Sequence, residues 1–172
     1  TRIINAALVD GVTPPEADGS FSRNSQVVCA VMTADCLPVL FCDVGGTVVA
    51  AAHAGWRGLL AGVLEASIVA MRVPGEELIA YLGPAIGPQA FEVGEEVRAA
   101  FVAADANAAQ AFQPAAEGKW LADIYGLARQ RLARKGLTRV YGGTYCTFTE
   151  AERFFSYRRG GKTGRMAWLG WL

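Results

Sequence analysis

The sequence has little of several things that define large classes of protein. Only 19% of its residues are charged, and sixteen Lys and Arg balance sixteen Asp and Glu, so its charge favours neither a nucleic-acid nor a membrane partner. No apolar run reaches the roughly 18 residues that span a bilayer. The first residues lack the basic and apolar segments of a secretory signal, so we expect a cytoplasmic protein. Among the residue types that commonly act in catalysis or metal binding, histidine is the scarcest, because the sequence contains one.

An initiator methionine is also lacking. We therefore expect that the numbering from Thr1 to Leu172 begins inside a longer natural chain. Four cysteines show no spacing typical of a disulfide framework, and Cys29 and Cys42 lie within apolar runs, as small buried side chains do. With 172 residues, of which 52% are hydrophobic, the chain has the material for one full core. We predict a single domain over residues 1–172.

Apolar runs and helical spacing alternate along the chain. The stretch to Ser25 is loop-rich, because Gly11, Pro14, Pro15 and Gly19 punctuate it. Apolar runs predict strands at 27–33, 38–43, 47–52, 78–82, 137–141, 153–157 and 166–171. Helical periodicity predicts helices over 59–71, around 93–101 and over 121–132. Short strands interleaved with three helices predict an α/β domain.

Two polar clusters interrupt this apolar framework. The only histidine, His53, follows an alanine run and precedes Gly55, and Thr33, Asp35 and Cys36 separate two predicted strands. If the strands pair across a Gly45-Gly46 turn, Cys36 and His53 emerge near the same end of the sheet. A thiol beside an imidazole is either a cysteine nucleophile with its base or two ligands of a zinc ion. Spacing alone leaves both interpretations open.

A basic segment near the C-terminus favours an anion. Arg158 and Arg159 stand beside Gly160 and Gly161, and guanidinium groups bind phosphate or carboxylate through paired N–H donors. The basic residues of the preceding predicted helix are more typical of a solvated face.

Four separated motifs in order resemble the bacterial laccase-domain family. They are Thr33-Ala34-Asp35-Cys36-Leu37-Pro38-Val39, His53-Ala54-Gly55-Trp56-Arg57-Gly58, Gly83-Pro84-Ala85-Ile86-Gly87 and Phe155-Ser156-Tyr157-Arg158-Arg159. Members are named variously polyphenol oxidase, purine nucleoside phosphorylase and peptidoglycan editing factor. The resemblance implies an α/β (α+β) fold, an αββα layered sandwich with mixed sheets. It also implies a zinc ion held by two histidines and a cysteine.

Carried onto this chain, the resemblance makes Cys36 the thiolate ligand and His53 one imidazole ligand. The family's other histidine lies in a segment that leads into a stretch like Thr1-Arg2-Ile3, so we expect it a few residues upstream of Thr1. Asp35 is either a base or, as we favour, a residue that orients the metal ligands. Copper is a possible substitute for zinc.

The reactions for which family members are named require different kinds of site. A multicopper laccase needs a mononuclear copper and a trinuclear cluster, hence many imidazoles, so we expect no genuine laccase turnover. The resemblance implies phosphorolysis of adenosine, inosine or methylthioadenosine, with adenosine deamination. For phosphate binding, the candidates are Arg57, Arg158 and Arg159. Trp56 is a candidate for stacking on the base, and the 83–88 loop for a wall of the pocket.

Two alternatives stay open. One is a hydrolase that edits a peptidoglycan precursor, with a muramyl peptide as substrate. The other is an inactive domain, if the first histidine ligand is truly absent.

Overall fold

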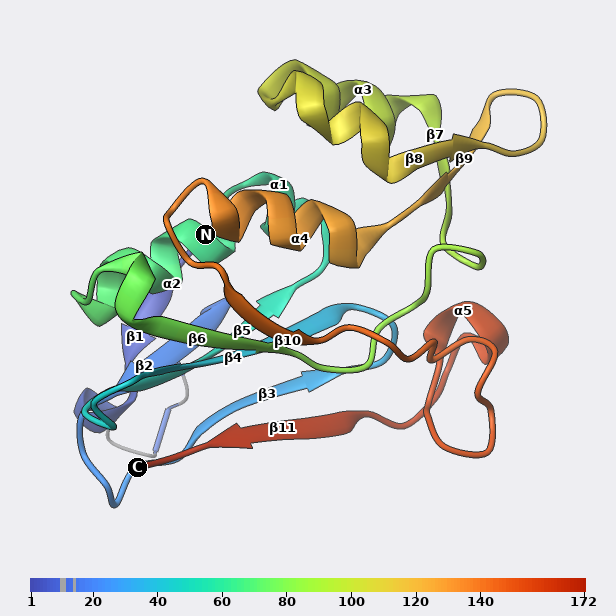
Figure 1. Cartoon of the computed structure of the whole chain (residues 1–172). Coiled ribbons are helices and arrows are strands. Elements are labelled where there is room, and N and C mark those ends of the chain that lie inside the picture. The colour runs from blue at the N-terminus through green and yellow to red at the C-terminus, as the bar shows by residue number, and fades with distance from the viewer. Residues whose placement is uncertain (10–11, 14) are drawn as a thin grey trace.

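The largest sheet has six strands in the order β1-β2-β5-β4-β6-β10 (Figure 1). The computed structural model describes residues 1–9, 12–13 and 15–172, so Gly11 and Pro14 of the N-terminal stretch lie outside the described residues. The strands are β1 (Ile3–Asn5), β2 (Gly19–Ser22), β4 (Leu37–Asp43), β5 (Val49–Ala54), β6 (Leu78–Leu82) and β10 (Arg139–Gly142). The pairs β1–β2 and β6–β10 are parallel, while β2–β5, β4–β5 and β4–β6 are antiparallel. The predicted α/β class with mixed sheets is confirmed.

Two smaller sheets complete the strands. In one, β11 (Met166–Gly170) pairs antiparallel with β3 (Cys29–Thr33), and Figure 1 shows this ribbon below the large sheet, on the face away from α2 and α4. The other has the order β7-β9-β8, formed by Glu92–Gly94, Lys119–Ala122 and Phe112–Pro114. The sequence did not predict this sheet, because its strands are only three or four residues long.

Helices cover the other face of the large sheet. They include α1 (Trp56–Leu60), α2 (Val63–Met71) and α4 (Ile124–Ala133), whereas α3 (Glu95–Ala104) packs with the three-stranded sheet, as Figure 1 shows. Short 3-10 turns are η1 (Ala6–Leu8), η2 (Gly75–Glu77) and η3 (Ala106–Ala111). The single helix predicted over 59–71 is wrong: Gly62 has a φ of 89°, in the left-handed region, and divides it into α1 and α2.

The strand predicted at 153–157 is also wrong. The chain there turns and then forms a short helix, α5 (Tyr157–Gly160). The hydroxyl of Ser156 accepts a hydrogen bond from the backbone N–H of Arg159 at 3.1 Å, which caps the first turn of this helix. A serine before a turn is a helix-start signal, and here it outweighs the apolar character of Phe154 and Phe155.

The core lies between the six-stranded sheet and its helices. Leu64 and Met71 of α2 and Leu127 and Leu132 of α4 are almost wholly buried in it. Each such side chain contributes about 1.5–3 kcal/mol on burial. In the sheet itself, β5 is an alanine run whose small side chains let neighbouring elements approach closely. This packing holds the β4–β5 hairpin, which carries Cys36 and His53 at one end.

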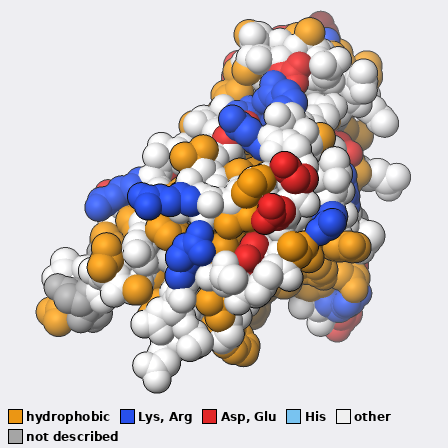
Figure 2. Space-filling view, turned by 60° about the vertical axis from the view of Figure 1, so that its left-hand side comes forward, with side chains coloured by type: hydrophobic (Ala, Val, Ile, Leu, Met, Phe, Trp, Pro, Cys, Tyr) orange, Lys and Arg blue, Asp and Glu red, His pale blue; other side chains and the backbone are white. Residues whose placement is uncertain are grey.

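Several charged side chains form ion pairs within the fold. Arg131 of α4 pairs with Glu65 of α2 at 2.8 Å, and Arg134 pairs with Asp105 at 2.9 Å. Charges of both signs are interspersed with apolar side chains on the face shown in Figure 2. None of the helices in the described ranges has the length and apolarity to traverse a bilayer.

Candidate active site

The β4–β5 hairpin brings Cys36 and His53 together. Pro38 is opposite His53 and Leu37 is opposite Ala54, so Cys36, immediately before β4, lies at the end of the sheet where β5 finishes. The predicted pairing of these strands is therefore confirmed. Both side chains converge over Gly55: a Cβ placed there would be 3.0 Å from Cys36 Sγ and 3.9 Å from His53 Nε2. Only glycine leaves this space open between the thiol and the imidazole.

A cavity of about 430 Å³ opens beside this pair. Its polar lining consists of Thr33, Asp35, Cys36, His53, Arg57, Tyr157, Arg158 and Arg165. Its apolar lining consists of Met32, Ala34, Trp56, Ile86, Phe91 and Ile124. The residues come from β3, the β3–β4 connection, β5, α1, the 83–88 loop, α4 and the C-terminal segment. A cavity with one apolar wall and a few convergent polar groups is the usual form of a small-molecule site.

The electrostatics of the site favour the uncharged forms of thiol and imidazole in the metal-free protein. Burial and the negative charge of Asp35 raise the pKa of the Cys36 thiol, and the positive charge of Arg165 lowers it in part. Partial burial lowers the pKa of His53, although Asp18 opposes this shift. A bound cation reverses the preference of the thiol, because it stabilises the thiolate as a ligand, and it keeps the preference of the imidazole, which binds a metal in its neutral form.

Asp35 is a buried connector between the hairpin and the C-terminal segment. Its carboxylate accepts hydrogen bonds from Thr147 Oγ1 at 2.6 Å, Ser156 Oγ at 3.0 Å and the backbone N–H of Arg158 at 2.7 Å. Its φ of 85° lies in the left-handed region, which aspartate tolerates better than most residues. The carboxylate therefore holds both Cys36, its neighbour in sequence, and α5 at the wall of the cavity.

The three predicted anion-binding arginines have different surroundings. Arg57 on α1 is exposed, stacks over the Trp56 ring at 4.3 Å and lines the cavity. Arg158 also lines it, and its Nη1 donates to the carbonyl of Glu92 at 2.9 Å. Arg159 is not among the cavity-lining residues, and its guanidinium donates to the carbonyls of Thr147, Phe148 and Phe154. The structure thus brings two of the three to the cavity.

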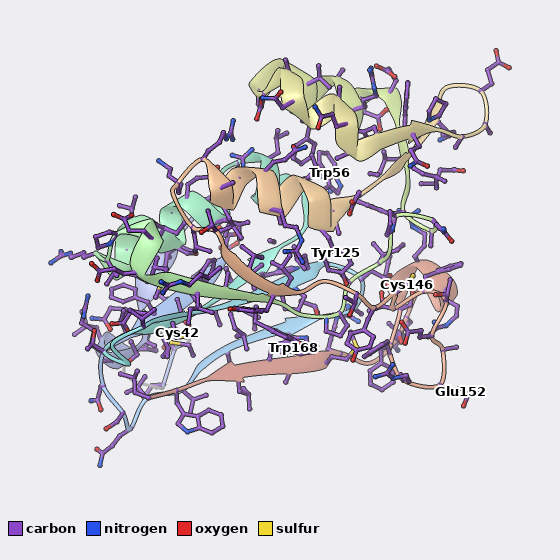
Figure 3. All side chains as sticks on the ribbon, in the orientation of Figure 1. Cys42, Trp56, Tyr125, Cys146, Glu152 and Trp168 are labelled. Atoms are coloured by element: carbon purple, nitrogen blue, oxygen red, sulfur yellow. The ribbon has the colours of Figure 1, made fainter. Side chains whose placement is uncertain are left out.

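The 83–88 loop is fixed by a tyrosine that sequence reasoning missed. The hydroxyl of Tyr125, on α4, accepts from the backbone N–H of Ala85 at 2.6 Å and donates to the carbonyl of Tyr145 at 2.9 Å. Figure 3 shows this side chain extending from α4 toward the loops at the end of the sheet. Burial raises the pKa of Tyr125, so the phenol stays protonated. This hydrogen bonding makes the predicted pocket wall rigid, with Ile86 facing the cavity.

For two further polar residues of the cavity lining, Thr33 and Arg165, the sequence predicted no role in the site. Arg165 lies in the loop before β11, where an isolated arginine gives no sequence signal beyond the glycine at position 164. Thr33 belongs to the polar cluster between two predicted strands and to the first family motif, but the sequence predicts no binding role for it. Its oxygen is buried and has no hydrogen-bond partner among the described residues.

The donor set fits part of a metal site. A thiol and an imidazole that converge over Gly55 match the ligand types that zinc prefers. Within residues 1–9, 12–13 and 15–172, no group of three or more His, Cys, Asp and Glu side chains is placed to hold a metal ion. Cys36 and His53 are therefore two potential ligands, and a metal ion held by them would take its other ligands from water, substrate or a group outside these residues.

Comparison with known proteins relates the whole chain to one family. Residues 1–172 match the family model described as "Multi-copper polyphenol oxidoreductase laccase". A protein of Pseudomonas aeruginosa named purine nucleoside phosphorylase is 60% identical over 173 residues, which cover 95% of this chain and 72% of that protein. The purine nucleoside phosphorylase YfiH of Escherichia coli is 62% identical over 156 residues, covering 91% of this chain and 64% of its own length.

Solved structures show the same fold. A Neisseria meningitidis protein superimposes with a TM-score of 0.96 at 59% identity, covering 99% of this chain and 70% of that one. YlmD of Geobacillus stearothermophilus gives a TM-score of 0.85 at 26% identity, covering 98% of this chain and 69% of its own. The chain thus spans about two thirds of the length of the proteins that it resembles.

Proposed function

Because the chain belongs to the multi-copper polyphenol oxidoreductase laccase family and its curated relatives carry the name purine nucleoside phosphorylase, we propose that it catalyses zinc-dependent phosphorolysis of purine nucleosides. Adenosine, inosine and methylthioadenosine are the proposed substrates, and adenosine deamination is a proposed second activity. The observation that carries the proposal is the convergence of Cys36 Sγ and His53 Nε2 over Gly55, at a cavity with both apolar and cationic walls.

Zinc is the proposed metal, and Cys36 and His53 are the residues that hold it. Thiolate and imidazole are common zinc ligands, and copper is a substitute that the same pair would accept. When bound, zinc supplies a Lewis acid that polarises an oxygen or acidifies a water molecule. The metal-binding proposal draws support from the donor types and from the open space that Gly55 leaves between them.

The cavity walls match the parts of a nucleoside and phosphate. A purine ring is flat and apolar on its faces, and Phe91, Ile86 and Ile124 provide an apolar surface against which it packs. Trp56 belongs to the same lining but is covered on one side by the Arg57 guanidinium, at 4.3 Å. Arginine N–H donors on the cationic side suit the phosphate. The volume of about 430 Å³ falls in the range of small-molecule sites.

Phosphorolysis requires little from the protein beyond positioning and charge. A phosphate oxygen forms a bond to the ribose C1′ while the bond from C1′ to the purine nitrogen breaks. The purine leaves with the bonding electrons and takes up a proton, and ribose 1-phosphate remains. Holding both reactants in one cavity converts a bimolecular encounter into an intramolecular one, which is a large part of the rate gain.

Asp35 is proposed as a positioning residue rather than a base. Its two carboxylate oxygens already accept three hydrogen bonds, which occupy most of the roughly four lone-pair sites that a base would offer to substrate. Its contribution is to keep Cys36 and Arg158 at the cavity.

The decisive experiment measures zinc content and product formation together. We expect about one zinc per chain after reconstitution, and release of ribose 1-phosphate from inosine with phosphate. Cys36→Ser and His53→Ala should remove most of the zinc and the activity. Cys42→Ser is the matched control, since Cys42 lies near the opposite end of β4 and outside the cavity.

Other outcomes distinguish the remaining possibilities. Unchanged zinc in both the Cys36 and His53 variants contradicts the metal assignment and favours a cysteine nucleophile. Hydrolysis of a muramyl-peptide precursor without nucleoside cleavage favours the editing hydrolase. Zinc binding without turnover of either substrate identifies an inactive domain.

A further inference from the structure

The hydroxyl of Thr33 is an unpaired polar group at the wall of the cavity. Thr33 is the last residue of β3 and is only 1% exposed, and its oxygen has no hydrogen-bond partner in the described part of the chain. The large majority of buried hydroxyl groups in proteins are hydrogen-bonded, so the Thr33 hydroxyl is available to bond a water molecule or a ligand. The same residue lines the cavity with Cys36 and His53.

Other buried polar atoms without a hydrogen-bond partner have different explanations. Glu65 and Arg131 belong to one ion pair, and Arg98 pairs with Glu95 through another nitrogen of its guanidinium. Trp168 packs between the β3–β11 ribbon and the large sheet (Figure 3). It is not among the residues that line the cavities of the described part of the chain. Thr33 is therefore the member of this group that belongs to the lining of the cavity beside Cys36 and His53.

Arg165 stands at the same end of the ribbon as Thr33. In the β3–β11 pairing, Thr33 is opposite Met166, the residue after Arg165. The Nη1 of Arg165 donates to the carbonyls of Thr163 and Gly164 at 2.9 and 3.0 Å. These bonds orient the guanidinium, while its other two nitrogens have no hydrogen-bond partner among the described residues.

The donors of Thr33 and Arg165 suit an inorganic oxyanion. A hydroxyl and a fixed guanidinium offer several N–H and O–H donors to the tetrahedral oxygens of phosphate. The nearest acidic group in sequence, Asp35, already accepts hydrogen bonds from Thr147, Ser156 and Arg158. Of the sequence-predicted arginines, Arg57 stacks over the Trp56 ring at 4.3 Å and Arg158 lies over the Phe91 ring at 5.6 Å, whereas Arg165 stacks on no aromatic ring of the described residues.

We propose that Thr33 Oγ1 and the Arg165 guanidinium form the phosphate subsite of the cavity. This inference rests on the proposed phosphorolysis, for which phosphate is the second substrate. It places phosphate at the end of the β3–β11 ribbon beside Cys36 and His53, and leaves the apolar wall for the purine. Neither residue belongs to the predicted anion-binding set of Arg57, Arg158 and Arg159.

The test separates the two substrates kinetically. Thr33→Val keeps the shape of the side chain and removes the hydroxyl, and Arg165→Gln removes the charge. Both variants should raise the KM for phosphate by at least about tenfold. Thr33→Val removes a hydrogen bond to phosphate that nothing replaces, and Arg165→Gln removes a charge-assisted one. The KM for inosine and the rate of adenosine deamination, which consumes water rather than phosphate, should change less than twofold. Thr33→Ser should retain phosphate binding.

Controls distinguish a local effect from a folding defect. Arg139→Gln removes an exposed arginine of β10 that is not part of the cavity lining, and it should leave every parameter unchanged. Thermal unfolding of each variant confirms that the fold persists. Equal increases in KM for both substrates, or unchanged phosphate KM in both variants, overturn the proposal.

Direct binding keeps the subsite testable if phosphorolysis itself fails. The ³¹P resonance of inorganic phosphate should broaden when the wild-type chain is added. It should broaden less when the Thr33→Val or Arg165→Gln variant is added. Phosphate binding that depends on these residues without turnover supports the subsite and contradicts the proposed reaction. Phosphate binding of equal strength in all variants refutes the subsite, whatever the reaction.

Discussion

Replacing Gly55 by alanine should separate metal binding from folding. Gly55 caps α1 with φ of −61° and ψ of 161°, a conformation that alanine adopts without strain. The added methyl group would lie 3.0 Å from Cys36 Sγ and 3.9 Å from His53 Nε2. Ordinary carbon contacts are about 3.5–4.0 Å, so the sulfur must move by roughly half an ångström.

This displacement is small for the fold and large for a metal. Zinc holds sulfur at about 2.3 Å and nitrogen at about 2.0–2.1 Å, so ligands cannot adjust by half an ångström at no cost. Disturbing the surroundings of metal ligands typically weakens affinity by about 10- to 100-fold, or about 1.4–2.7 kcal/mol, and we expect a loss of this size. The free energy of unfolding of the metal-free chain should change by less than about 1 kcal/mol, since glycine-to-alanine changes at compatible sites are mild.

Competition with a chromophoric chelator measures the zinc affinity, and urea denaturation measures the stability. Gly160→Ala is the matched control, because a Cβ at Gly160 would meet no heavy atom within 4 Å. If Gly55→Ala binds zinc as tightly as the wild type, the metal does not lie between Cys36 and His53, and the central feature of the proposed site is refuted.

Three further predictions concern other parts of the structure. Asp35→Ala should lower the free energy of unfolding in urea by roughly 2–4 kcal/mol, because a buried charged acceptor of three hydrogen bonds is lost. A change below about 1 kcal/mol would show that other contacts hold the C-terminal segment. Tyr125→Phe should cost about 1–3 kcal/mol, since the N–H of Ala85 loses its partner, and an unaltered melting temperature would contradict this. Hydrogen bonds from Thr149 and neighbouring N–H groups lower the pKa of Cys146, whereas burial raises that of Cys42. The thiolate of Cys146 therefore forms at lower pH, and peptide mapping after iodoacetamide treatment at pH 7.5 should find Cys146 modified before Cys42; the reverse order would refute the assignment.

The parts of the fold that sequence could predict are those that local patterns encode. The hairpin of β4 and β5 joins two apolar runs across adjacent glycines, so pairing and the proximity of Cys36 to His53 follow from a short stretch. Strand β6 coincides with the predicted 78–82. The helix over 59–71 failed at Gly62, since apolar spacing continues across the break and only the backbone conformation reveals it.

Contacts between distant segments could not be predicted. The bonds of Asp35 reach Thr147 and Ser156, 112 and 121 residues further along the chain. Thr33 and Arg165 are likewise joined only by the pairing of β3 with β11. Residues of this kind have no motif of their own, because their roles depend on which strand the fold places beside them.

The span of the Asp35 contacts sets an order of assembly during synthesis. The β4–β5 hairpin is complete once the ribosome has released residue 54, and chains fold from the N-terminus as they emerge. The partners of Asp35 at α5 are synthesised more than 100 residues later, so the two strands that carry the thiol and the imidazole are made well before the segment that forms the last wall of the cavity. Closing so long a loop has an entropic cost that is met only after α5 has been synthesised. A ribosome-bound nascent chain that stops before Thr147 would therefore present the thiol–imidazole pair without the wall that encloses a substrate.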